Sequence, residues 1–336
     1  MVYFYCDAST EIGFGHLQRC VLLARYLQDT VGQSIAFIET SATVKNHLQR
    51  LGIKKTILLN ELPPQQMIIF DIVHEKTLST PDECCMLLNQ LHQLGHKIIF
   101  IDGVGEHRFN PKANTVPIVE LILTPYLFSN EAPHLPCQRW LRGKEYILIE
   151  PQLKKINVNF SCSVKNVLIT MGGSDKVNIT LQVLNTLQPN THLYFHIVLG
   201  SLFSHDLKSG IKTLAKQHPN FNLINEPSSL LPYYKQADLV ICSTGITSYE
   251  VFAAGLPSIQ ISPTLIHAKN FSYSEISQCM KHLGYYKTIA NSDIRKVFQW
   301  LLTNKDQRVN MANQARQLID GNGLERVALM TQSRYF

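Results

Sequence analysis

Short apolar runs rich in β-branched residues alternate along this chain with longer stretches whose apolar residues recur at helical spacing. Strands buried on both faces read as continuous apolar runs, and this alternation predicts a parallel sheet wrapped by helices. A helix is expected over residues 82–94. The strands expected in the first half are 2–7, 34–40, 55–59, 67–72, 97–102, 121–124 and 146–150.

The alternation restarts after the stretch "EPQLKKINVNFSCS", which has no clear period. The strands expected there are 166–171, 193–200, 221–225, 237–243 and 257–262, followed by helices over 292–303, 306–319 and about 321–334. The fold class is therefore α/β with two Rossmann-like domains. We expect one domain over 1–150, a linker over 151–163, and a second domain over 164–336 that includes the C-terminal helices.

Composition narrows the function classes. The chain has 336 residues, 45% of them hydrophobic and 17% charged, with a net charge of +6 spread without basic runs. That distribution argues against a nucleic-acid partner and suits a small anionic ligand. Eight cysteines without a CxxC pair are expected as reduced thiols. No leader-like start or apolar run of ~18 residues is present, so we expect a cytoplasmic protein without membrane insertion.

Ligands of open α/β sheets bind at the carboxyl ends of the strands, and the stretch "EIGFGHLQRC" follows the first predicted strand. Gly13 and Gly15 allow a sharp turn, and His16 lies where the helix begins. The dipole and unpaired N–H groups at that end hold an imidazole neutral, as a general base requires. His16 could also merely cap or pack the helix. Arg19 could reach a phosphate or a carboxylate, or form a structural salt bridge.

A second turn, "TMGGSDKVNIT", follows the strand expected at 166–171. Gly172 and Gly173 allow the backbone to approach a phosphate closely, while Ser174 or Asp175 could cap the next helix. A plain strand-to-helix turn is the alternative. The pattern does not match the GxxxxGK[ST] phosphate loop, so it gives no support for ATP chemistry of that type.

The third turn lies in "CSTGITSYEVFAAGLPSI" and opens another helix. Its residues are Thr244, Gly245, Ile246, Thr247 and Ser248. N–H groups at such a helix start suit a diphosphate, and Glu250, one turn further on, could accept hydrogen bonds from ribose hydroxyls. Gly255 is expected to end this helix. The alternative is an ordinary helix cap.

Four blocks in this order resemble a known family over nearly the whole chain. They are "DASTEIGFGHLQRC", "NVLITMGGSDKVNITLQVL", "ADLVICSTGITSYEVFAAGLPSI" and "RVNMANQARQLIDGNGLERVAL". The chain is similar to the hydrolases of pseudaminic acid biosynthesis that remove UDP from UDP-2,4-diacetamido-2,4,6-trideoxy-β-L-altropyranose, and to related spore-coat polysaccharide proteins.

This resemblance implies a glycosyltransferase-B type architecture with an interdomain cleft. The C-terminal domain would hold UDP and the N-terminal domain would supply the sugar pocket. His16 matches the general base of the family, and Gly13 and Gly15 match the glycines beside that base. The turn at 244–247 and Glu250 match the UDP-binding turn and its acid. The pair Gly172 and Gly173 matches glycines that face the cleft.

The reaction implied is hydrolysis with inversion. Water held by His16 would attack the anomeric carbon from the face opposite UDP. UDP is a good leaving group, and the helix start at 245–248 would stabilise its developing charge, with no cofactor and no metal. A glycosyltransferase that uses the same fold and UDP turn, or a non-catalytic nucleotide-sugar binding protein, remains open.

The chain departs from the family pattern at an Asp-His-Tyr segment. Asp71 is kept and is counted as a catalytic candidate, but Ile72 and Val73 replace the histidine and the tyrosine. The tyrosine is expected near the sugar in the family, so the identity of the sugar stays open. The oligomeric state stays open as well.

Further candidates lie in loops. Asn270 is the best match for a family asparagine and the third catalytic candidate, with His267 or Lys269 as possible substitutes for a polar contact. Asp102 could line the cleft or cap a turn, and Tyr126 lies in a region that points towards the sugar in the family. Two histidines alone make no metal site, so His92 and His96, on or just after the 82–94 helix, are expected to be solvated.

Overall fold

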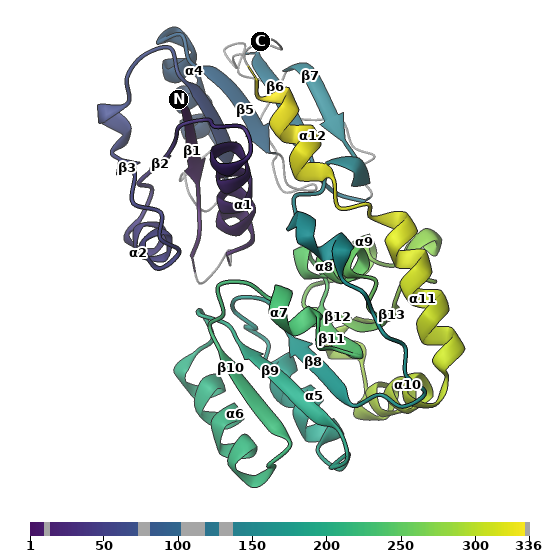
Figure 1. The fold of residues 1–336 in the computed structure, drawn as a ribbon. Helices are drawn as coiled ribbons and strands as arrows, with labels where there is room; N and C mark the ends of the chain where they lie inside the picture. The colour runs from purple at the N-terminus through teal and green to yellow at the C-terminus, as the bar shows by residue number, and fades with distance from the viewer. Residues whose placement is uncertain (10–13, 73–80, 102–117, 128–136, 333–336) are drawn as a thin grey trace. The chain divides into compact units, whose positions relative to one another are not determined.

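The computed structural model describes residues 1–9, 14–72, 81–101, 118–127 and 137–332 (Figure 1). The chain divides into two compact units. Unit 1 comprises Met1–Ile149 and Asn322–Phe336, and unit 2 comprises Glu150–Gly321. Each unit is built on its own parallel sheet. In the part of the chain that is described, no helix has both the length and the apolar character needed to cross a bilayer.

Unit 1 contains a seven-stranded sheet in the order β3-β2-β1-β4-β5-β6-β7, and every pair is parallel. Its strands are β1 (Val2–Cys6), β2 (Ile35–Ile38), β3 (Thr56–Ile57), β4 (Met67–Asp71), β5 (Lys97–Ile101), β6 (Val119–Thr124) and β7 (Cys137–Arg142). Strand β1 pairs with both β2 and β4, so the strand order reverses there. The carboxyl ends of β1 and β4 thus form the switch point at which α/β sheets bind ligands.

Helices cover both faces of this sheet. Those of unit 1 are α1 (Gly15–Asp29), α2 (Ala42–Arg50), α4 (Pro81–Gln93), α12 (Gly323–Met330) and the 3₁₀ helices η1 (Leu59–Glu61) and η2 (Lys144–Tyr146). Buried side chains of α1, α2 and α12 share one core with alternate residues of β1 and β2, while α4 packs in the core on the opposite face. In Figure 1, α12 lies beside α1.

Unit 2 contains a six-stranded sheet in the order β10-β9-β8-β11-β12-β13, again with parallel pairs. Its strands are β8 (Asn166–Thr170), β9 (Tyr194–Leu199), β10 (Phe221–Asn225), β11 (Leu239–Ser243), β12 (Ser258–Ser262) and β13 (Lys281–Tyr285). This is the 3-2-1-4-5-6 strand order of the Rossmann fold, and its switch point lies between β8 and β11.

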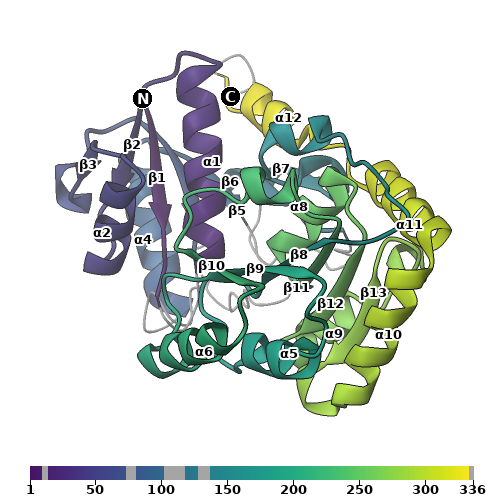
Figure 2. The ribbon, with the colours of Figure 1, turned by 60° about the horizontal axis from the view of Figure 1, so that its bottom comes forward.

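Seven α-helices are described in unit 2. They are α5 (Ile179–Leu187), α6 (His205–Gln217), α7 (Leu231–Tyr234), α8 (Ile246–Ala254), α9 (Leu265–Asn270), α10 (Asn291–Thr303) and α11 (Lys305–Leu318), with 3₁₀ helices η3 (Pro151–Lys155), η4 (Ser274–Ile276) and η5 (Tyr286–Thr288). Helices α5, α6 and α10 pack on one face of the sheet around a single core (Figure 2). Helix α8 packs against β11 and α11.

The predicted strands match the sheet centres, and the differences lie at the edges. Residues 147–150 run outside the sheet after η2, so the strand predicted at 146–150 is wrong. Strands β7 and β13 were not predicted. Each is an edge strand whose residues are only partly buried or exposed, and polar residues interrupt the apolar run that identified the central strands.

Helix α12 lies in unit 1, whereas the sequence predicts it in the second domain. Leu324 and Val327 are buried in the core formed with α1. Gly323 sits so close to Ile147 that a Cβ would collide with the Ile147 carbonyl. The segment expected as a linker belongs to unit 2, where Leu153 is buried and Arg308 donates a hydrogen bond to the Ser161 carbonyl at 2.9 Å.

This packing predicts how a cavity in α12 affects stability. Leu324→Ala is expected to lower the free energy of unfolding by about 2–5 kcal/mol, because Leu324 is 1% exposed. Leu329→Ala on the same helix serves as the control, since Leu329 is 39% exposed and its loss should cost within about 0.5 kcal/mol. Amide hydrogen exchange should show the lost protection in the strands of unit 1. Loss of hydrogen-exchange protection confined to unit 2 would contradict the placement of α12 in unit 1.

Candidate functional site

His16 and Asp71 meet at the switch point of unit 1. His16 is the second residue of α1, which follows β1, and Asp71 is the last residue of the neighbouring β4. His16 Nδ1 lies 2.6 Å from Asp71 Oδ1. The Asp71 side chain is fully buried, while the His16 side chain keeps 15% of its surface exposed. Parallel pairing of β1 and β4 therefore brings together two residues that are 55 positions apart.

Arg19 holds the Asp71 carboxylate from the same helix. Its Nε and Nη2 atoms both donate to the carboxylate oxygens, which makes the contact bidentate. Its Nη1 donates to the Tyr126 hydroxyl at 2.6 Å. Cys20 adds a weaker S–H donor, 3.6 Å from Asp71 Oδ2. Of the two kinds of partner expected for Arg19, a phosphate or a carboxylate, the structure shows the carboxylate.

Charge and burial act in opposite directions on Asp71. Burial alone would raise the pKa of this carboxyl, but the charge of Arg19, followed by His16 and hydrogen bonds from both, lowers the pKa to about 2. Burial likewise opposes the charge of Arg19, and the neighbouring Asp71 and Tyr126 raise the pKa of Arg19 well above its usual value. The pair is therefore ionised at neutral pH despite complete burial.

The carboxylate also orients the imidazole. In the neutral ring, Nδ1 must carry the proton to bond with Asp71, because two acceptors 2.6 Å apart would repel. Arg19 Nη2 lies 3.0 Å from the same Nδ1, but it cannot donate to a nitrogen that is already protonated. Nε2 is then the free lone pair, and no described residue bonds to it. An imidazole held in this way by a carboxylate is suited to accept a proton.

The glycine turn of unit 2 follows β8 and packs tightly. Gly172 adopts φ +73°, and a Cβ on Gly200 would lie 2.7 Å from the Gly172 carbonyl oxygen. Asp175 caps α5, because its carboxylate accepts hydrogen bonds from the N–H groups of Ile179 at 2.9 Å and Thr180 at 2.8 Å. Of the two predicted caps, Asp175 therefore serves and Ser174 does not. Gly173 and Ser174 are partly exposed at this turn.

The turn after β11 opens α8 at the switch point. Gly245 has φ +146°, and its N–H donates to Ser248 Oγ at 3.1 Å. That donor is therefore occupied from within the turn. The N–H groups of Ile246 and Thr247 have no acceptor among the described residues, as expected at the first turn of a helix. Gly255 ends α8 with φ +66°, which confirms the predicted C-cap.

Thr244 begins a series of hydrogen bonds across the strand ends, which is buried at Thr244 and Ser262 and partly exposed at His282. Its hydroxyl lies 2.9 Å from Ser262 Oγ, and Ser262 Oγ lies 2.8 Å from His282 Nε2. Burial lowers the pKa of His282, while a hydrogen bond with the Phe271 backbone opposes this shift. These hydrogen bonds connect the turn after β11 to β12 and β13. The sequence predicts no role for Ser262 or His282.

Glu250 lies beside Tyr234, the last residue of α7. The Tyr234 hydroxyl donates to Glu250 Oε2 at 2.8 Å. Burial raises the pKa of Glu250 to about 7, with the hydrogen bond from Tyr234 lowering it and the charge of Glu150 raising it further. Burial, followed by Glu250, raises the pKa of Tyr234 well above its ordinary value. No sequence pattern predicts this contact, because α7 has only four residues and Glu250 lies 16 positions away on another helix.

Other predicted residues lie elsewhere. Asn270 is the last residue of α9 in unit 2, and neighbouring His267 bonds through Nδ1 to its helix cap Thr264 at 2.7 Å. Gly13 and Asp102 lie outside the described residues, as does Val73.

The two histidines of the α4 region differ. His92 is exposed, as expected. The expectation for His96 was wrong: it is 2% exposed, and its Nδ1 accepts a hydrogen bond from the Gln66 N–H at 3.0 Å. The ring fills the turn between α4 and β5, where its backbone partner satisfies one nitrogen.

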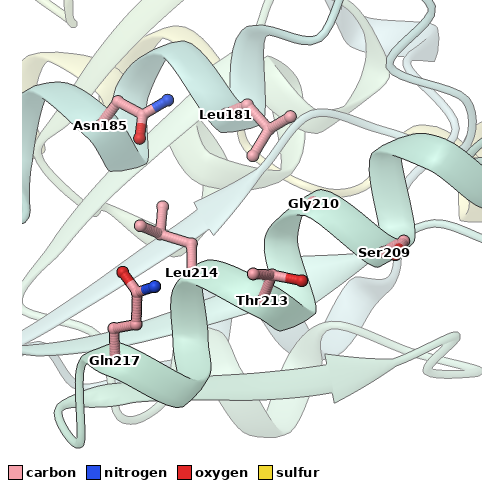
Figure 3. Close-up of a pocket in the computed structure, with 7 residues that line it drawn as sticks. All are labelled: Leu181, Asn185, Ser209, Gly210, Thr213, Leu214 and Gln217. Carbon is pink, nitrogen blue, oxygen red and sulfur yellow. The ribbon is translucent and has the colours of Figure 1, made fainter.

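A groove of about 350 Å³ lies between α5 and α6, away from these turns (Figure 3). Its lining residues are Leu181, Asn185, Ser209, Gly210, Thr213, Leu214 and Gln217. None of them ionises, and none belongs to a strand-end turn, so the groove lacks the groups that acid–base chemistry needs. Among the described residues, no three His, Cys, Asp or Glu side chains gather as metal ligands would.

No family model matches this chain. It is 22% identical to the spore coat polysaccharide biosynthesis protein SpsG of Bacillus subtilis, over 99% of this chain and 98% of that protein. It is 26% identical to an uncharacterised protein of Methanocaldococcus jannaschii over 75% of this chain. The match covers 54% of that archaeal protein, so the chain spans about half its length.

Solved structures resemble this chain over nearly its whole length. MurG of Acinetobacter baumannii superposes with a TM-score of 0.59 at 16% identity, over 98% of this chain and 99% of that one. A UDP-GlcNAc 2-epimerase of Neisseria meningitidis, solved with UDP-GlcNAc, has a TM-score of 0.59 at 14% identity, over 99% of this chain and 100% of that one. MnaA of S. aureus, solved with UDP, has a TM-score of 0.61 at 12% identity, over 100% of this chain and 97% of that one. The chain has the glycosyltransferase-B fold. At these identities the likeness establishes the fold alone.

The ion pair predicts a pH-dependent contribution to stability. The pKa of Asp71 falls from 3.8 to about 2 on folding, so the ionised carboxylate stabilises the fold above about pH 4 and loses this effect as the pH falls towards 2. The shift corresponds to about 2 kcal/mol. Asp71→Asn should abolish this step.

Asp71→Asn should also cost about 3–5 kcal/mol at pH 7, because it leaves Arg19 buried without a counter-charge. Urea denaturation from about pH 2 to about pH 7 measures both the pH-dependent step and the loss of stability at pH 7. The exposed Asp29→Asn is the control and should shift stability by no more than about 0.5 kcal/mol. Equal pH profiles for wild type and Asp71→Asn would contradict the assignment.

Proposed function

We propose that this chain is a nucleotide-sugar hydrolase. Its substrate would be UDP linked to a 2,4-diacetamido-2,4,6-trideoxyhexose or a related sugar, and the reaction would serve the biosynthesis of a nonulosonic acid or a surface polysaccharide. The main support is the His16–Asp71 pair, in which a carboxylate held by Arg19 leaves His16 Nε2 open. The similarity to a spore coat polysaccharide biosynthesis protein agrees with this role.

In the proposed reaction, His16 Nε2 takes a proton from water as the water oxygen attacks the anomeric carbon. The bond between that carbon and the UDP oxygen breaks, and the electron pair leaves with UDP. Attack from the opposite face inverts the anomeric configuration. Asp71 keeps Nδ1 protonated and stabilises the imidazolium that forms, as a carboxylate does beside a catalytic histidine.

Unit 2 would bind the UDP moiety. The N–H groups of Ile246 and Thr247 at the start of α8 suit a diphosphate, and Glu250 suits the ribose hydroxyls. Gly172, Gly173 and Ser174, in the turn after β8, would also contact the substrate. Gly15 and Tyr126 are proposed contacts of the substrate, and Asn270 is the third proposed catalytic residue.

Transfer of the sugar to an acceptor is the second candidate, because solved structures of this fold include WaaG, a glycosyltransferase involved in lipopolysaccharide biosynthesis. A panel of UDP-linked acetamido and diacetamido-trideoxy sugars separates the candidates. Release of UDP without an acceptor, with inverted free sugar detected by NMR, supports the hydrolase. Release only in the presence of an acceptor supports the transferase. Tight UDP binding without turnover supports a non-catalytic binding protein.

Removing the proposed base tests the mechanism. His16→Ala should lower kcat for UDP release by about 10²–10⁴-fold, because proton transfer loses its acceptor. Affinity for UDP should stay within about twofold, since the proposed UDP contacts lie in unit 2. His92→Ala, at an exposed histidine on α4, is the matched control and should leave kcat unchanged. Full activity of His16→Ala would rule out this base.

A further inference from the structure

The hydrogen bond between Tyr234 and Glu250 has no part in the chemistry proposed above. Tyr234 is 1% exposed, so its hydroxyl is fixed by the surrounding protein and donates to Glu250 Oε2 at 2.8 Å. Glu250 is partly exposed, and no described residue bonds to its Oε1. One oxygen of this carboxyl is therefore engaged from inside the protein and the other is open.

We propose that Tyr234 is a positioning residue for nucleotide recognition: by engaging Oε2 of Glu250, it presents Oε1 to a ribose hydroxyl in a single orientation. This inference rests on the proposed binding of UDP at the turn of α8. A hydroxyl donates most strongly to an ionised carboxylate. Recognition of the ribose therefore favours Glu250 in its charged form, and binding of a ribonucleotide near pH 7 releases protons from the fraction of carboxyls that are protonated in the free protein.

The groups around Glu250 set the direction of this coupling. Among the residues that the structure describes, the ionisable groups that interact with Glu250 are Tyr234 on α7, Glu150 directly before η3, and the Cys242 thiol on β11. Burial raises the pKa of Glu250 to about 7; the Tyr234 hydrogen bond lowers it and the charge of Glu150 raises it. Loss of the Tyr234 hydroxyl thus favours the protonated form. Loss of the Glu150 charge favours the ionised form.

UDP binding across pH tests the proposal. Calorimetry of wild type with UDP and 2′-deoxy-UDP, from about pH 5 to about pH 9, should show affinity for UDP rising through about pH 7. Above that pH, UDP should bind about tenfold more tightly than the deoxy ligand. Measurements in buffers of different ionisation enthalpy should show proton release on binding near pH 7 for UDP and less for 2′-deoxy-UDP.

Two variants should shift this profile in opposite directions. Tyr234→Phe should lower UDP affinity about tenfold, move the pH midpoint upward and reduce the preference for ribose. Glu150→Gln should move the midpoint downward, and it leaves the buried Tyr234 in place, so it remains informative if Tyr234→Phe folds poorly. Tyr233→Phe on the same helix is the matched control and should change neither property.

Each outcome decides a different point. Unchanged ribose preference and midpoint in Tyr234→Phe, with UDP binding intact, would overturn the positioning role and leave the proposed function standing. UDP binding with the predicted pH shifts but without turnover would overturn the hydrolase and leave the positioning role standing. Failure of wild type to bind UDP would overturn both.

Discussion

A fully buried carboxylate at the end of β4 constrains the arrangement of unit 1. Asp71 cannot be buried as an anion unless charge and hydrogen-bond donors surround it, and α1 supplies them through His16, Arg19 and Cys20. Three donors from neighbouring turns of one helix set the rotation of α1 about its axis. That rotation also places His16 at the switch point of the sheet, so one interaction serves both stability and the proposed chemistry.

Asp71, which is fully buried, and Glu250, which is partly buried, show how partners decide the ionisation state of a carboxyl. Asp71 ends β4 in unit 1 and Glu250 lies on α8 in unit 2, and at both positions burial acts to raise the pKa. Asp71 faces a guanidinium and stays ionised, whereas Glu250 faces a phenol and a second carboxylate and titrates near neutrality. A carboxyl beside a fixed cation suits a permanent structural role. A carboxyl close to its titration point suits a role that changes when a ligand arrives.

The sequence was sufficient for the central strands, because burial on both faces leaves a continuous apolar run. It was insufficient for β7 and β13, where edge positions admit polar residues. It placed His16 and Asp71 at strand ends, but their contact depends on β1 and β4 being neighbours, which local spacing does not encode. The contact of Tyr234 with Glu250 is hidden in the same way, because it depends on how two different helices, α7 and α8, lie in the fold. The position of α12 was missed because amphipathic spacing shows that a face is buried without showing against which sheet.

The return of α12 to unit 1 affects the order in which the protein can be assembled during synthesis. The core around α1 includes Leu324 and Val327, which leave the ribosome after the whole of unit 2. At typical elongation rates, a gap of roughly ten to forty seconds separates synthesis of the last strand of unit 1 from synthesis of that helix. The residues of α1 that pack against α12 lack these partners until the interval ends. The N-terminal half of the chain, although translated first, is thus the last to be completed.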